Sequence, residues 1–87
     1  MANLKSNGSE IVRFRRTLED KHFPSVLEYS LRSNGWVLKK VKLTTGWSGW
    51  TRAWKYAMGT PDEQMLALRR RLERHPVKGC TVEEVTA

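Results

Sequence analysis

All four tryptophans of this 87-residue chain lie between residues 36 and 54. A chain of this length forms one domain and buries only about 60–65% of the surface that it exposes when unfolded. Each fully buried indole removes roughly 150–250 Å² from water, on the order of 4–6 kcal/mol of transfer free energy. We therefore expect Trp36 and Trp54 to lie in the core, whereas Trp47 and Trp50 fit either the core or a surface that faces a partner.

The positive charge is concentrated in the same region as the tryptophans. The chain has a formal net charge of +7, yet the five cations and five acids that follow Met58 cancel. Residues 31–60 contain no Asp or Glu and six cations: Arg32, Lys39, Lys40, Lys42, Arg52 and Lys55. An asymmetry of this kind indicates an acidic partner rather than a particular fold.

The first third of the chain contains two segments with helical patterns. In residues 9–20, Ile11, Phe14 and Leu18 recur at helical spacing, which favours a helix, although alternation around Arg13 and Arg15 leaves a strand as the alternative. In residues 25–34, Ser25 and Glu28 have the spacing of a capping box, and Asn34-Gly35 is typical of a helix end. We therefore predict a second, short helix there.

Two alternating runs, residues 36–44 and 50–58, predict a β-hairpin around the loop from Gly46 to Gly49. In the favoured register, one side of the hairpin faces the core and carries Val37, Val41, Leu43, Trp54, Tyr56 and Met58. The other side carries Lys40, Lys42 and Lys55 and is expected to contain no acid. A slip of one residue would reverse this assignment, because side chains alternate between the two faces of a sheet.

Residues 60–75 carry the clearest helical pattern. Thr60 is a typical N-cap, Pro61 suits the first helical position, and Met65, Leu68 and Leu72 repeat on one face. Beyond Pro76, residues 80–85 are either a short edge strand or a frayed end. The predicted fold class is α+β, in the order α-α-β-β-α with helices on one face of a small sheet. The domain spans residues 9–76, between a flexible leader (1–8) and a C-terminal tail (77–87).

The sequence contains no recognisable catalytic or metal-binding pattern, so we expect no enzyme activity, cofactor or metal. His22 and His75 are far apart in sequence, and Cys80 is the only cysteine, which excludes an internal disulfide. The GWSG stretch lacks the spacing of a nucleophile elbow. There is no signal-like or membrane-spanning apolar run, which favours a cytoplasmic protein without membrane contact.

Two short resemblances involve the predicted helix at residues 25–34 and the basic segment WVLKKVK. The pair resembles the first helix and strand of HicA-type messenger-RNA interferases. Those enzymes carry a histidine shortly after that strand, where this chain has Thr44, Thr45 and Gly46, so ribonuclease activity is not implied. The same helix with the basic hairpin also resembles the recognition helix and wing of winged-helix DNA binders, which have two further helices before it.

The favoured function is non-enzymatic binding of DNA or RNA by the basic, Trp-rich hairpin, because such sites combine cations for phosphates with aromatic rings for bases. The expected contacts are Lys39, Lys40, Lys42, Trp47, Trp50, Arg52 and Lys55, with Arg69 and Arg70 as a secondary basic patch. The alternative is an inhibitor or adaptor, such as mobile elements encode, that binds a larger host protein or nucleoprotein through the same Trp and Arg side chains.

Overall fold

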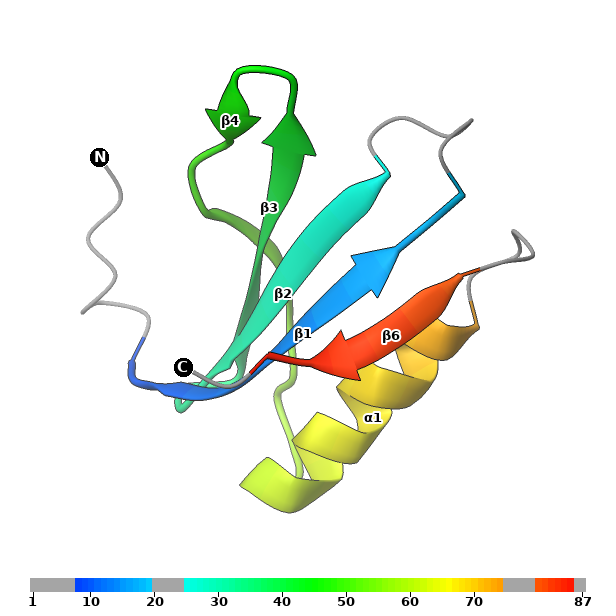
Figure 1. The fold of residues 1–87 in the computed structure, drawn as a ribbon. Helices are drawn as coiled ribbons and strands as arrows, with labels where there is room; N and C mark the ends of the chain where they lie inside the picture. The colour runs from blue at the N-terminus through cyan, green and yellow to red at the C-terminus, as the bar shows by residue number, and fades with distance from the viewer. Residues whose placement is uncertain (1–7, 20–24, 75–79, 86–87) are drawn as a thin grey trace.

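The computed structural model describes residues 8–19, 25–74 and 80–85 (Figure 1). Within these residues the chain forms six strands and one helix. In chain order they are β1 (Glu10–Thr17), β2 (Val26–Arg32), β3 (Trp36–Leu43), β4 (Gly46–Trp47), β5 (Thr51–Lys55), α1 (Pro61–Glu73) and β6 (Thr81–Glu84).

The six strands form one antiparallel sheet in the order β4-β3-β2-β1-β6, and β5 also pairs with β3. Strands β5 and β4 share the outer edge of β3, where β5 pairs with residues 36–39 and β4 with residues 42–43. At the other end of the order, β6 pairs with β1. The C-terminal segment, expected to be an edge strand or a frayed end, is therefore an edge strand.

Helix α1 packs on one face of this sheet (Figure 1). Its residues Leu68 and Leu72 are buried against apolar side chains from the three central strands. The buried side chains of these strands are Val12, Phe14, Leu27, Tyr29, Leu31 and Val37. We call this side of the sheet the covered face.

The predicted order α-α-β-β-α is wrong, because residues 9–20 contain strand β1 rather than a helix. The apolar residues Val12 and Phe14 alternate along β1 and are buried against α1, whereas Arg13 and Arg15 point away from it. Ile11, Phe14 and Leu18 have helical spacing, but the segment is a strand because β1 pairs with β2 on one side and with β6 on the other.

The predicted helix at residues 25–34 is also wrong, because this segment forms strand β2. Its residues alternate strictly, with Leu27, Tyr29 and Leu31 in the core and Glu28 and Ser30 between them. The Ser25 carbonyl accepts a hydrogen bond from the Leu18 amide (2.7 Å) and so joins β1 to β2 instead of starting a helix. Both resemblances depended on a helix here, so neither describes this fold.

The predicted hairpin and the last helix agree with the structure. Strands β3 and β5 pair antiparallel, and Trp54 and Tyr56 pack against the core as expected, but Leu43 (38%) and Met58 (85%) are exposed. The first half of the predicted loop forms the short strand β4. The first turn of α1 has a full capping box, in which Glu63 N–H donates to Thr60 Oγ1 (3.2 Å) and Thr60 N–H donates to Glu63 Oε1 (2.9 Å).

Gly35 forms the tight turn between β2 and β3 with a φ of 91°, a conformation that favours glycine. Its carbonyl accepts a hydrogen bond from the Tyr56 amide (2.8 Å). A side chain at this position would also meet the Tyr56 carbonyl oxygen. The Asn34-Gly35 signal therefore marks a hairpin turn, packed against the end of β5, rather than a helix end.

Candidate nucleic-acid interface

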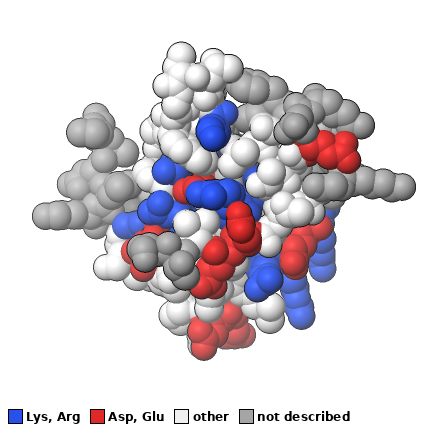
Figure 2. Space-filling model, viewed as in Figure 1, with Lys and Arg blue, Asp and Glu red and all other residues white. Residues whose placement is uncertain are grey.

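The sheet surface opposite α1, called the open face here, carries most of the charged side chains of β1, β2 and β3. Figure 2 shows Lys and Arg side chains gathered over the strands, with Asp and Glu among them. Strand alternation and pairing place three acids on this face, Glu10, Glu28 and Glu83. They also place seven cations there: Arg13, Arg15, Arg32, Lys40, Lys42, Arg52 and Lys55. Seven minus three leaves this face with a formal charge of +4.

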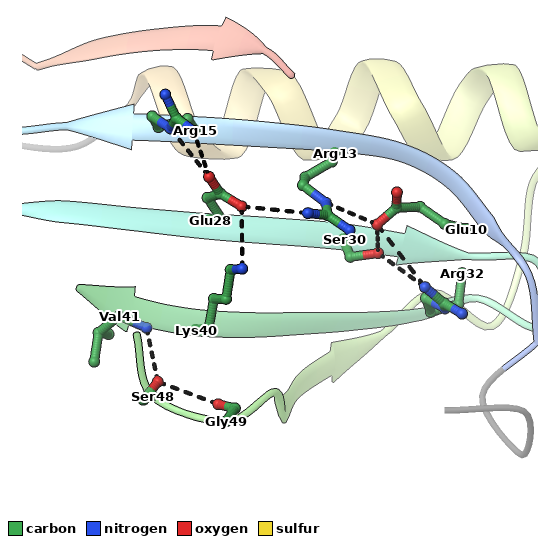
Figure 3. A network of polar contacts seen from close by, with 10 residues as sticks. All are labelled: Glu10, Arg13, Arg15, Glu28, Ser30, Arg32, Lys40, Val41, Ser48 and Gly49. Atoms are coloured by element: carbon green, nitrogen blue, oxygen red, sulfur yellow. Dashed lines mark hydrogen bonds and ion pairs between the residues drawn. The ribbon is translucent and has the colours of Figure 1, made fainter. Parts of the chain in front are cut away.

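Glu28 is the centre of the largest ion-pair cluster on the open face (Figure 3). It is only 3% exposed, and its Oε2 accepts hydrogen bonds from Arg15 Nε (3.0 Å) and Nη2 (2.8 Å). Its Oε1 lies 3.6 Å from Arg13 Nη1 and 3.6 Å from Lys40 Nζ. The prediction that the face of Lys40 contains no acid is therefore wrong. Strand β2, which was not predicted as a strand, places the buried Glu28 carboxylate opposite Lys40.

Glu10 forms a second polar cluster at the start of β1 (Figure 3). Its Oε2 accepts hydrogen bonds from Ser30 Oγ (2.5 Å) and Arg13 Nε (3.0 Å), and Arg32 Nη1 lies 3.8 Å away. Burial by itself raises the pKa of Glu10, but the hydrogen bonds from Ser30 and Arg13 and the charges of Arg13 and Arg32 outweigh it. The net effect is a lowered pKa, because the protein stabilises the ionised form.

Trp47 and Trp50 lie over the Lys40 side chain. Lys40 Nζ is 4.7 Å from the Trp47 ring centroid and 4.9 Å from that of Trp50, and the Arg13 guanidinium lies 5.1 Å from the Trp50 ring. Ser48 holds the intervening loop, since it exchanges two hydrogen bonds with the Val41 backbone, each 2.9 Å long. Trp47 remains 39% exposed and Trp50 is half-buried. The loop thus places two indoles beside a charged cluster.

Trp36 also lies on the open face, although the sequence predicts a core position. The Arg52 guanidinium is 4.6 Å and Lys55 Nζ 5.7 Å from the Trp36 ring centroid. Simple alternation would put Arg52 on the same side as Trp54. A bulge in β5 changes this, because Val37 pairs with Trp54 while the next residue, Leu38, pairs with Arg52. The bulge brings Arg52 and Lys55 onto one face.

The predicted cationic contacts of the hairpin lie in three different environments. Lys42, Arg52 and Lys55 are exposed on the open face, whereas the Lys40 side chain is only 18% exposed and is bound within the cluster. Lys39 is exposed on the side of β3 that carries α1, since its neighbours at two-residue spacing, Val37 and Val41, contact the core.

Arg69 and Arg70, the secondary patch, are exposed on α1 and do not join the open face. Arg69 Nε lies 3.6 Å from Glu73 Oε2 within the helix. Arg70 lines a hollow beside Tyr56 on the covered side of the sheet. The hairpin cations and the helix cations are therefore two separate surfaces.

Charged and polar residues of β1 and β2 complete the open face and were not predicted as part of the site. These residues are Glu10, Arg13, Arg15, Glu28, Ser30 and Arg32. The signal that identifies them is the strict alternation in LEYSLR, which places every second side chain of β2 away from the core. The capping-box spacing of Ser25 and Glu28 obscured that signal.

Within residues 8–19, 25–74 and 80–85, no three His, Cys, Asp or Glu side chains are grouped so that they could hold a metal ion. His22 and His75 lie outside the described residues. Cys80 is half-buried, with its Sγ 3.9 Å from the Leu72 carbonyl oxygen. The described part of the chain has no helix with the length and apolar character needed to cross a membrane.

Comparisons of this chain with protein-family models, with curated proteins and with solved structures found no match.

Proposed function

We propose that this protein binds unpaired stretches of nucleic acid, without catalysing a reaction, through the open face of its sheet. The observation that supports the proposal best is the position of Trp47 and Trp50 over Lys40, on the same face as the exposed cations of β3 and β5. Proteins that bind single strands combine a basic track for the backbone with aromatic rings on which bases stack. Both parts are present on this face, and α1 covers neither.

In this proposal, the phosphates contact Lys42, Arg52 and Lys55 rather than all the cations of the hairpin. Lys40 is engaged by Glu28 and the two indoles, so its role is to position Trp47 and Trp50. Three neutralised phosphates on a single strand give a slope of about −2 for log K against log salt. Affinity should then fall about twentyfold between about 50 and about 200 mM salt.

The indoles supply the contact with bases. Trp47 is 39% exposed, which leaves area for a base to stack while Lys40 holds the ring in place. Stacking of one base on an aromatic side chain is worth about 1–3 kcal/mol. Because every base has a flat face, we expect weak sequence preference and a clear preference for single strands over duplexes.

The test is fluorescence anisotropy with labelled single-stranded DNA, single-stranded RNA and a duplex, each at the two salt concentrations. We expect Trp47→Ala to weaken single-strand binding by roughly 5- to 150-fold, whereas Leu43→Ala, at the same hairpin and 38% exposed, leaves it unchanged. Lys42→Gln should lower both affinity and salt slope, and Arg69→Gln on α1 is the matched control. Equal affinity at both salt concentrations would exclude a mechanism led by phosphate contacts.

A second proposed function is that of an inhibitor or adaptor that binds another protein. It is supported by the exposed apolar side chains Leu43 and Trp47 on the β3–β4 hairpin, which extends from the sheet in Figure 1. Exposed tryptophans are common anchors of protein interfaces. In this case Trp47→Ala should abolish capture of a stoichiometric protein from nuclease-treated lysate, while Lys42→Gln retains it and nucleic-acid affinity stays at background.

A further inference from the structure

A hollow of about 480 Å³ lies between the second half of α1 and the residue that follows β5. Its lining comprises Tyr56, Ala67, Arg70, Arg71 and Arg74. Ala67, Arg70 and Arg71 of α1 and its C-cap residue Arg74 follow the spacing i, i+3, i+4 and i+7, which places them on one side of the helix. The volume is within the range of pockets that bind small ligands.

Three arginines line this hollow, which we call the arginine hollow. Among the residues that the structure describes, no carboxylate forms an ion pair with Arg70, Arg71 or Arg74. Arg69 is different, because it points to another side of the helix and pairs with Glu73. The negative end of the helix dipole offsets only about half an elementary charge. The hollow therefore retains an excess of positive charge that a bound anion would neutralise.

The aromatic residues of β5 and the segment after it fix one of these guanidinium groups. The Arg71 guanidinium lies 3.9 Å from the Trp54 ring centroid, and Trp54 in turn packs against Tyr29 (5.8 Å) and Tyr56 (6.4 Å). Stacking of this kind holds the planar Arg fork in one orientation before any ligand binds. Tyr56 adds an aromatic wall and a hydroxyl group to the same hollow.

We propose that the arginine hollow binds the phosphoryl group of a nucleotide-sized ligand. A phosphate monoester carries a charge of about −1.5 to −2 and three acceptor oxygens, which suits a hollow lined by three arginines better than a carboxylate does. The ring of Tyr56 is the surface on which the rest of the ligand packs.

The hollow is separate from the proposed nucleic-acid interface. Trp54 faces the covered side of β5, whereas Arg52 and Lys55 face the open side. A free nucleotide and the 5′-phosphate end of a strand present the same chemistry, so the experiment must distinguish these two sources.

The test is an NMR titration of the labelled protein, followed at the tryptophan indole N–H signals, of which that of Trp54 lies beside the hollow. The ligands are adenosine monophosphate, adenosine, inorganic phosphate, and one oligothymidylate with and without a 5′-phosphate. We expect a saturable shift of the Trp54 signal with adenosine monophosphate, displacement by inorganic phosphate and no shift with adenosine. A shift seen only with the 5′-phosphorylated strand would assign the site to strand ends.

Variants on α1 separate this site from general attraction of anions to a basic protein. The double variant Arg70→Gln with Arg74→Gln changes two exposed residues and should weaken binding by at least about tenfold. Arg69→Gln removes the same kind of charge outside the hollow and should change affinity less than about twofold. No saturable shift with any phosphorylated ligand up to about 10 mM, or equal losses in both variants, would overturn the proposal.

Discussion

The two faces of the sheet bury side chains by different means. On the covered face, Phe14, Leu31 and Leu68 exclude water through apolar packing against α1. On the open face, Glu28 and Ser30 are buried almost as deeply, although both are polar. There, burial depends on the ion pairs drawn in Figure 3 and on the indole rings that lie over Lys40.

One strand pattern can therefore build both an apolar core and a polar one. In β2, Leu27, Tyr29 and Leu31 face α1, whereas the residues between them, Glu28 and Ser30, face the charged cluster. A buried carboxylate is tolerated only when cations and hydrogen bonds replace its lost hydration. Arg13, Arg15 and Lys40 surround Glu28 in this way, and their aliphatic stems cover the strands.

The largest effect that we expect is from Glu28→Gln, which removes the buried carboxylate that Arg13, Arg15 and Lys40 share. The free energy of unfolding should fall by about 3–5 kcal/mol, measured by urea denaturation. The matching variant on the covered face is Leu68→Ala. It should lower the free energy of unfolding by about 2–5 kcal/mol, because it leaves a cavity beneath α1.

Salt distinguishes these two losses. Raising the salt concentration to about 1 M should recover part of the loss in Glu28→Gln, because it screens repulsion between the three cations, and should not recover the cavity loss in Leu68→Ala. Equal responses of the two variants to salt would show that the faces are stabilised alike.

A smaller effect is expected for Lys40→Met, which removes the charge but keeps an apolar chain beneath Trp47 and Trp50. Glu28 retains Arg13 and Arg15, so the loss of stability should be about 1–2 kcal/mol by the same denaturation assay. The matched control is Lys39→Met, next to it in sequence but on the other side of β3, which should change stability by less than about 0.5 kcal/mol. A loss as large for Lys39→Met would contradict the assignment of Lys40 to the cluster.

The smallest effect that we expect is a pH dependence of the free energy of unfolding that is due to Glu10. The pKa of Glu10 in the folded protein is lowered from its ordinary value of 4.5, so Glu10 contributes stability above the unfolded pKa and loses it as pH falls through the folded pKa. The difference in unfolding free energy between the wild type and Glu10→Gln should be less than about 1 kcal/mol near neutral pH and should disappear in acid.

Denaturation midpoints of both proteins between about pH 7 and pH 2 would test this dependence. Glu63 also has a lowered pKa, through its hydrogen bonds with Thr60, so the comparison with Glu10→Gln is needed to isolate the open face. A difference that stays constant as the pH falls would show that Glu10 acts by packing rather than by charge.

The elements that sequence analysis predicted correctly are those with local signals. The start of α1 follows from Thr60, Pro61 and Glu63, which satisfy backbone groups within one turn. The alternation of β3 depends equally on neighbouring residues. Such signals need no knowledge of the remaining fold.

Strands β1 and β2 were predicted incorrectly because their stability comes from partners distant in sequence. Phe14 is opposite Tyr29 on one side and Glu84 on the other, and no local pattern specifies that β6 will lie beside β1. The candidate site was predicted only in part for the same reason. Lys42, Trp47 and Lys55 follow from the hairpin, whereas Arg52 reached the open face through a bulge.

Local sequence is enough to specify the N-cap of α1, the basic and aromatic character of residues 36–55 and the hairpin that carries it. The strands β1 and β2 and the ion pair between Glu28 and Lys40, in contrast, depend on the folded chain as a whole. They differ from α1 because a helix forms its hydrogen bonds within itself. A strand, or a buried charge, is stable only beside a partner that the folded chain brings to it.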